Sequence, residues 1–208
     1  MPIDKEETPL ECLSEETLLS EFVTPAAAKQ LIAEYASIYN ILKHTSEQQL
    51  VGITGIGKAK LRKLACIKAV IQRMEQERKK QIQRVSKPQD AADYCFDMQD
   101  LRQEEFRVLL LDTKNKILAQ KCVFIGTVNS SLVSAREVFH AAVQNMATNI
   151  IVLHNHPSGE PSPSQEDKEV TKRLVRAGKI LNIPVIDHII IGKNGYFSFK
   201  EGGYMDSC

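Results

Sequence analysis

The hydrophobic pattern of this 208-residue chain changes in kind at one place, and that change limits the folds open to it. Before residue 75, apolar residues recur at helical spacing. After residue 88, they fall into short alternating or wholly apolar runs. The segment 75–84 between them is too polar to bury, and Pro88 follows it. A polar run that ends in a proline is typical of a domain boundary. The sequence therefore predicts a helical domain over 1–86 and a mixed domain over 87–208.

The first domain is predicted to be small and all-helical. Leu31, Ile32 and Tyr35 form an apolar stripe in a segment of strong helix formers. Ser46 and Gln49 match a capping box, which predicts a short helix over 47–51. A glycine-containing turn then leads into a long helix that begins near Lys58.

The second domain alternates between strand and helix patterns. Its helices are expected after Ser134, which with Glu137 resembles a capping box, and from about Gln165 to Leu181. Apolar or alternating runs predict strands over 106–111, 117–125, 149–154, 184–191 and 196–199. The domain is therefore expected to be of the α/β or α+β class, behind the small helical module.

Composition excludes several classes of protein. No secretory leader is recognisable, and no apolar run approaches the roughly 20 residues that span a bilayer. The five cysteines are odd in number and form no Cys-x-x-Cys pair, which favours reduced thiols over disulfides or a thiolate zinc site. We therefore expect a cytoplasmic protein with no membrane contact, and the sequence leaves its oligomeric state open.

Charge is unevenly distributed although the net charge is only +1. Residues 1–24 hold seven acidic side chains against one lysine, whereas residues 51–87 hold eleven Lys or Arg against two glutamates. A basic segment of this kind indicates an anionic partner, or a solvated helix that happens to carry lysine and arginine.

The residue types best suited to bind a metal ion are concentrated between residues 154 and 167. His154 and His156 are two residues apart at the end of a predicted strand, so they point to the same side. Asp167 falls in the first turn of the following helix. Two imidazoles and a carboxylate suit one zinc ion per chain with a fourth position for water, which then ionises near neutral pH. Ser164 and Asp167 also fit a helix capping box, and a lone histidine at a strand end is usually structural.

The spacing His-x-His-Pro, six residues, Ser, two residues, Asp resembles the motif of the JAMM (MPN+) metalloproteases. The surrounding sequence is similar to the bacterial RadC-like proteins over about residues 95–205. The similar stretches include Asn-His-Pro-Ser-Gly and Ile-Pro-Val-Ile-Asp-His-Ile-Ile-Ile-Gly. The resemblance implies a central curved sheet flanked by helices, related to the cytidine deaminase fold. It also implies zinc-dependent cleavage of a peptide or isopeptide bond.

The resemblance assigns further roles to residues outside the ligand set. JAMM enzymes use a glutamate ahead of the first core strand as a general base, and Glu104 and Glu105 are the two candidates here. Because Glu105 directly precedes the aromatic residue that opens the strand, it is our choice. Ser164 would donate a hydrogen bond to the oxyanion. Asp187 and His188 are interpreted as structural, with support of a zinc ligand as the alternative.

The N-terminal domain resembles a helix-hairpin-helix module. Its hydrophobic-Gly-x-Gly turn would let amides at a helix N-terminus approach phosphate, and basic side chains would add contacts to the DNA backbone. The implied DNA-binding residues are Gly55, Gly57, Lys58, Lys60, Arg62 and Lys63. The alternative is a tight helical connection with no ligand.

The sequence supports three alternatives to amide hydrolysis to different degrees. The first alternative is a DNA-repair accessory protein whose metal domain acts on nucleic acid or is only structural. A scaffold that has lost its metal is disfavoured by the intact ligand set. Zinc deaminase chemistry needs His-x-Glu and Pro-Cys-x-x-Cys, and neither occurs. The protein or peptide substrate is not identified by the sequence.

Overall fold

The computed structural model describes residues 9–126 and 133–205. The chain divides into two compact units, Met1–Glu77 and Arg78–Cys208, with the division inside one long helix. The boundary expected from the sequence, between residues 86 and 87, lies after that helix has ended. No helix among the described residues combines the length and the apolar character needed to cross a membrane.

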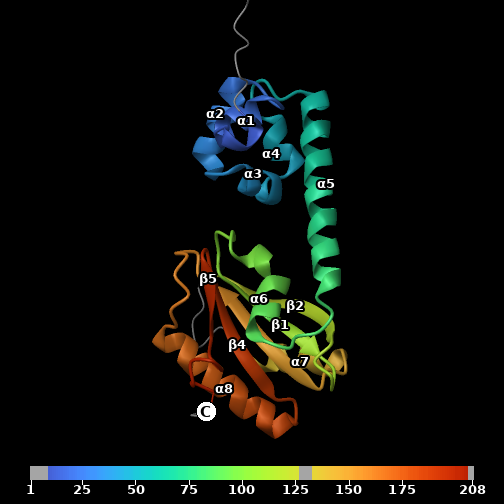
Figure 1. Ribbon diagram of the computed structural model, residues 1–208, viewed down its shortest axis with the longest axis vertical. Helices are drawn as coiled ribbons and strands as arrows, with labels where there is room; N and C mark the ends of the chain where they lie inside the picture. The colour runs from blue at the N-terminus through green and yellow to red at the C-terminus, as the bar shows by residue number, and fades with distance from the viewer. Residues whose placement is uncertain (1–8, 127–132, 206–208) are drawn as a thin grey trace, which may run out of the picture. The chain divides into compact units, whose positions relative to one another are not determined.

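The first unit is helical, as expected (Figure 1). A buried cluster that includes Leu19, Leu31 and Leu64 holds it together. The capping box of Ser46 and Gln49 is confirmed, since each side chain bonds the backbone of the other. The elements are η1 (Leu10–Cys12), α1 (Glu15–Ser20), α2 (Pro25–Tyr35), α3 (Ile38–His44), α4 (Glu47–Val51) and α5 (Lys58–Gln81).

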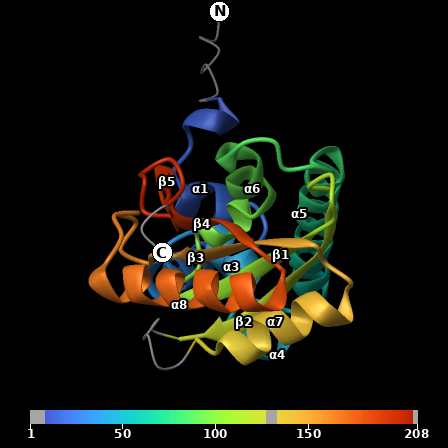
Figure 2. The same ribbon diagram turned by 90° about the horizontal axis from the view of Figure 1, so that it is seen from below.

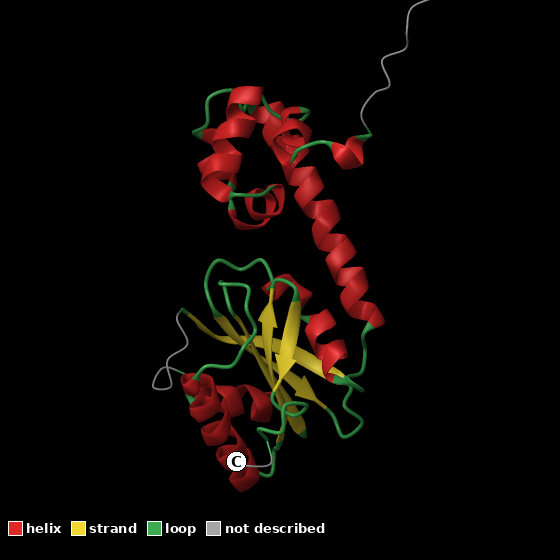
Figure 3. Ribbon diagram, turned by 60° about the vertical axis from the view of Figure 1, so that its left-hand side comes forward, coloured by secondary structure: helices red, strands yellow, loops and turns green. Residues whose placement is uncertain are grey.

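The second unit is a five-stranded mixed sheet with helices on both faces, which confirms the expected α+β class (Figure 3). The strand order is β2-β1-β3-β4-β5, and only β3 and β4 are parallel. The elements are α6 (Pro88–Tyr94), η2 (Phe96–Met98), β1 (Glu105–Leu111), β2 (Ile117–Ile125), α7 (Ala135–Gln144), β3 (Asn149–Asn155), α8 (Gln165–Leu181), β4 (Val185–Gly192) and β5 (Gly195–Ser198).

The central strands β1 and β3 are buried on both faces, so their successive side chains point alternately into two hydrophobic cores. Phe106 and Val108 pack with α7 and α8, which lie on the same side of the sheet (Figure 2). Leu109 and Leu111 pack with residues of α6 on the opposite side. In the register of the antiparallel pair, Phe106 lies opposite His154. This register decides which polar residues near the strand ends can meet.

Two local expectations need correction. Ser134 does precede α7, but its side chain makes no capping hydrogen bond, so the box with Glu137 is not formed. The sequence does not predict helix α6, because a proline after a polar run indicates a break in the chain. Proline is favoured in the first turn of a helix, and Asp90 accepts hydrogen bonds from the amides of Ser86 and Lys87 at 2.8 and 3.0 Å.

Candidate metal centre

The carboxyl end of β3 presents two histidines on one side of the sheet. His154 lies within the strand and is fully buried, while His156 follows the last strand residue and is partly exposed. Their Nε2 atoms are 3.0 Å apart. Hydrogen bonding continues past the strand end, because the amide of His156 donates to the carbonyl of Ile191 in β4 at 3.0 Å.

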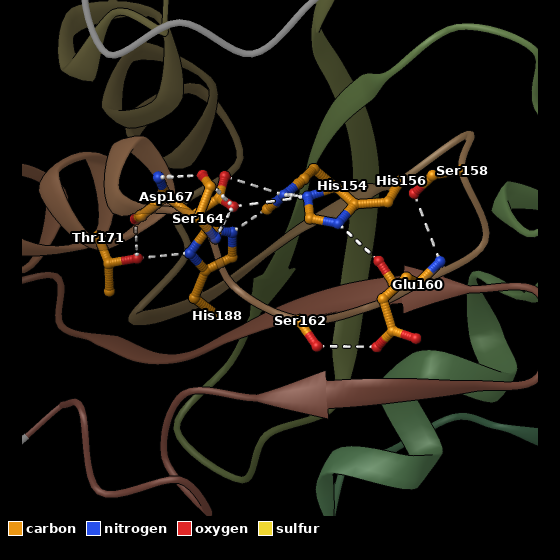
Figure 4. Close-up of polar contacts among 9 residues, drawn as sticks. All are labelled: His154, His156, Ser158, Glu160, Ser162, Ser164, Asp167, Thr171 and His188. Carbon is orange, nitrogen blue, oxygen red and sulfur yellow. Dashed lines mark hydrogen bonds and ion pairs between the residues drawn. The ribbon is translucent and has the colours of Figure 1, made fainter.

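Helix α8 brings a carboxylate to the same point. Asp167 lies in its first turn and is 2% exposed. Its Oδ1 is 3.0 Å from Nε2 of His154, and its Oδ2 is 3.5 Å from Nε2 of His156. Figure 4 shows the three side chains converging. The structure thus brings together the three residues expected to hold the metal.

The loop after His156 is held largely by its backbone. The amide of Gly159 donates to the carbonyl of His156 at 2.9 Å, and the amide of Lys193 donates to the carbonyl of Gly159 at 3.0 Å. Nδ1 of His156 lies 2.8 Å from the carbonyl oxygen of Glu160. A carbonyl can only accept, so Nδ1 carries the hydrogen and, in the neutral ring, Nε2 offers a lone pair to the centre.

The arrangement fits a tetrahedral zinc ion. One ligand atom from each of the three residues lies within 4.8 Å of the others. Zinc binds nitrogen and carboxylate oxygen at about 2.0–2.2 Å, so two ligand atoms on a tetrahedral ion are about 3.3–3.6 Å apart. The observed separations of 3.0, 3.0 and 3.5 Å are close to that spacing. Acceptor atoms packed this closely repel one another unless a cation or proton lies between them.

Electrostatics keep the carboxylate ionised. Burial alone would raise the pKa of Asp167, but the adjacent imidazoles of His154 and His156 outweigh it and hold that pKa well below its ordinary value. The proximity of Asp167 in turn raises the pKa of His156. The centre therefore keeps a negative charge that attracts a cation.

Glu105, our choice for the general base, lies on the face of the sheet opposite His154. Its Oε2 accepts hydrogen bonds from Nε and Nη2 of Arg107 at 2.8 and 2.6 Å. Nη1 of Arg107 lies 2.7 Å from Oδ2 of Asp97, so these residues form a network on the α6 side of the sheet. Because His154 belongs to the opposite face, the assignment of Glu105 is wrong on geometric grounds.

Glu104 shares the face of the metal centre. Phe106 lies opposite His154, so in the antiparallel register the residue two before Phe106 comes beside the residue two after His154. The negative charge of Glu104 contributes to raising the pKa of His156. The side chain of Asn155 fixes the backbone on either side of Glu104, because it accepts from the amide of Glu105 at 2.8 Å and donates to the carbonyl of Gln103 at 3.1 Å.

Ser164 caps α8 and also contacts a candidate ligand. Its hydroxyl donates to Oδ2 of Asp167 at 2.6 Å and accepts from the amide of Asp167 at 3.1 Å. The capping box considered as the alternative to a metal site is therefore present together with the metal-site geometry. To stabilise an oxyanion, the hydroxyl would turn from Asp167 to the substrate.

The candidate DNA-binding residues lie in the first unit, the two glycines in the turn before α5 and the four basic residues in its first two turns. Gly55 has φ +94°, and a Cβ there would come within 2.4 Å of Oγ1 of Thr24, so glycine is required. Gly57 has open space around it. Lys58, Arg62 and Lys63 are exposed, whereas Nζ of Lys60 donates to the carbonyl of Gly55 at 3.0 Å.

Two further buried residues lie behind the centre. The sequence favours a structural role for His188 and indicates no role for Thr171. His188 on β4 lies 2.8 Å from Nδ1 of His154, and Thr171 on α8 lies 2.6 Å from His188. Burial holds the pKa of His188 well below its ordinary value, so this ring is neutral. Thr171 follows Asp167 by one helical turn. This four-residue spacing is the sequence feature that places Thr171 on the same side of the helix as Asp167. Asp187 has a structural role, accepting from the amides of His188 and Lys200 and from Ser198.

Comparison with known proteins agrees with this geometry. Residues 85–204 match the family model described as the RadC-like JAB domain. A UPF0758 protein of Caldanaerobacter subterraneus is 44% identical over 180 residues, which cover 86% of this chain and 77% of the relative. A UPF0758 protein of Bacillus cereus is 45% identical over 166 residues, covering 79% and 74%. On these matches, this chain belongs to the RadC-like JAB domain family.

Proposed function

We propose that the protein is a zinc-dependent hydrolase that cleaves an amide bond in a peptide or isopeptide. The observation that carries the proposal is the convergence of three metal-ligating atoms, from His154, His156 and Asp167, at a strand end. A bound zinc ion would polarise the scissile carbonyl and lower the pKa of an attacking water. The family match supports a JAB-type hydrolase fold.

The chain's own residues supply proton transfer and charge stabilisation. Glu104, on the face of the centre, would take a proton from the attacking water and return it to the leaving nitrogen. Asn155 holds the backbone that carries Glu104. The hydroxyl of Ser164 would donate to the oxygen on which negative charge develops.

Elemental analysis of the purified protein tests the metal site. We expect about one zinc per chain, lost in His156→Ala and in Asp167→Asn, which keeps the size of the capping side chain. His140→Ala, on the exposed face of α7, is the matched control and should retain zinc. Absence of zinc from the wild type after reconstitution would overturn the proposal.

A substrate screen tests the reaction. The zinc-loaded protein would be incubated with a library of internally quenched peptides, with isopeptide-linked peptides and with single- and double-stranded DNA. Cleavage of an amide probe that Asp167→Asn abolishes would support the proposal. Zinc-dependent cleavage of DNA alone would instead favour the nucleic-acid alternative.

We propose DNA as a partner of the first unit, on the strength of its glycine turn and of the exposed Lys58, Arg62 and Lys63 that follow it. Replacing Lys58, Lys60 and Lys63 by glutamine should weaken binding to a fluorescent duplex and reduce the slope of log K against log salt by about 3, roughly one for each lysine. A triple variant of exposed lysines in the second unit, Lys114, Lys121 and Lys172, is the control. Equal binding by both variants would leave the turn as a structural connection.

A further inference from the structure

A chain of hydrogen bonds runs from one candidate ligand back to another through the protein interior. Nδ1 of His154 lies 2.8 Å from Nε2 of His188. Nδ1 of His188 lies 2.6 Å from Oγ1 of Thr171, and that hydroxyl lies 2.6 Å from the backbone carbonyl of Asp167. His154, His188 and Thr171 have no exposed surface. Figure 4 shows the contacts from His154 through His188 to Thr171.

The donor and the acceptor in each of these hydrogen bonds follow from the last group in the chain, the carbonyl of Asp167. The carbonyl of Asp167 can only accept, so the hydroxyl of Thr171 donates its single hydrogen there. Thr171 must then accept from His188, whose Nδ1 carries the hydrogen. His188 has no exposed surface, and its two ring nitrogens contact Thr171 and His154 rather than a carboxylate that would balance a positive charge. Its ring therefore carries one hydrogen, on Nδ1, and its Nε2 accepts from Nδ1 of His154. The remaining nitrogen of His154, Nε2, is thereby left without a hydrogen and points into the centre.

We infer that His188 and Thr171 are positioning residues that fix His154 in the tautomer able to bind a metal through Nε2. The inference rests on the proposed metal site for its purpose, but the tautomer itself is a property of the metal-free protein. The histidine that binds a metal through one nitrogen generally donates its other N–H to a fixed acceptor. Here that acceptor is a second histidine.

Packing restrains the two rings as well. Phe106 stacks on His154 with centroids 6.0 Å apart and an angle of 11° between the ring planes. Phe199 stacks on His188 at 4.7 Å and 13°. Rotation of either imidazole would break a stacking contact and a hydrogen bond together. The chain also closes on Asp167, so it links ligands from β3 and α8 through β4 before any metal arrives.

A neutral acceptor has an electrostatic consequence. A carboxylate in place of His188 would add a second negative charge close to the centre, beside that of Asp167. With histidine there, a divalent cation bound by two imidazoles and one carboxylate would keep a net charge of about +1, which would favour polarisation of a carbonyl oxygen.

Long-range ¹H–¹⁵N NMR on the metal-free, histidine-labelled protein reads the tautomers directly. We expect hydrogen on Nδ1 of both His154 and His188 in the wild type. In Thr171→Val, His188 loses its acceptor, so the hydrogen should shift toward Nε2 of both rings. Thr171→Ser keeps the hydroxyl and should restore the wild-type pattern. His188→Gln, whose amide oxygen can accept from Nδ1 of His154, is a second rescue variant.

Zinc affinity, measured by chelator competition, gives an independent readout. Thr171→Val should weaken zinc binding by about 10- to 100-fold, and Thr171→Ser should bind as the wild type does. Unchanged tautomers and unchanged affinity in Thr171→Val would overturn the inference. A wild type that binds no zinc would overturn the proposed function, while the tautomer comparison between the valine and serine variants would still decide the role of Thr171.

Discussion

Arg107 holds the carboxylate of Glu105, with Nε and Nη2 at 2.8 and 2.6 Å from Oε2. Both side chains are largely buried, and the second partner of Arg107, Asp97, is buried too. These two charge-assisted bonds hold the carboxylate of Glu105 on the face of the sheet opposite His154. Glu105 therefore has a structural role, and the proposed general base is the adjacent Glu104.

Changing Glu104 to Gln should lower the turnover of the amide probe by about 10²- to 10⁴-fold, because the general base is removed while the ligands remain. Zinc content should stay at the wild-type level. The measurement is the initial rate of probe cleavage beside elemental analysis of the same sample.

The matched variant Glu105→Gln should keep most of its turnover but lose about 1–3 kcal/mol of unfolding free energy, because it weakens a buried charge-assisted contact of Arg107. Denaturant unfolding measures that loss. If Glu105→Gln abolished cleavage and Glu104→Gln did not, the register argument for Glu104 would be refuted.

Gly192 at the end of β4 should tolerate no side chain. A Cβ there would come within 2.4 Å of the carbonyl oxygen of Gly159 and 2.8 Å of Cδ of Pro161, in the loop that orients His156. We expect Gly192→Ala to cost about 1–3 kcal/mol of stability and to weaken zinc binding about tenfold or more, since the loop must move.

Gly195 provides the control for this change. It lies in the same hairpin, and a Cβ there has nothing within 4 Å. Gly195→Ala should match the wild type in both thermal unfolding and zinc titration. Equal zinc affinity in the Gly192 and Gly195 variants would show that the loop does not position His156.

Cys95 should make the second unit less stable at alkaline pH. Burial raises the pKa of its thiol to about 12, from 9.0. Between these values the unfolded chain loses the proton and the folded chain keeps it. Stability is therefore complete below about pH 9 and falls as pH rises toward 12, by up to about 1.4 kcal/mol per unit.

Urea unfolding of the metal-free protein between pH 8 and 10.5 checks this. The difference in slope between wild type and Cys95→Ala isolates the thiol, and Cys66→Ala, at an exposed site, is the control. Parallel curves for the wild type and Cys95→Ala would contradict the expectation. Native Cys95 should also resist alkylation at pH 8, because only the thiolate reacts.

Local sequence was sufficient to predict the elements that carry the ligands. An apolar run ending in His-x-His indicated β3, and a serine followed three residues later by aspartate indicated the start of α8. The match of two histidines and an aspartate at family spacing then predicted one site. Each of these signals lies within a short stretch of chain, which is why it could be recognised.

The choice between Glu104 and Glu105 could not be made in the same way. Adjacent residues on a strand face opposite sides, so the answer depends on how β1 is paired with β3, some 50 residues away. The partnership of His188 with His154 is also non-local. Helix α6 was missed for a different reason, since seven residues are too few to show a helical period.

The loop after His156 is fastened mainly through backbone atoms, by way of Gly159, Lys193 and the carbonyl of Glu160. Ser158 and Ser162 add side-chain bonds, the first accepting from the amide of Glu160 and the second donating to its carboxylate. Because backbone atoms are the same in every residue, the length of this loop constrains the candidate ligand His156 more than the identity of its exposed side chains does.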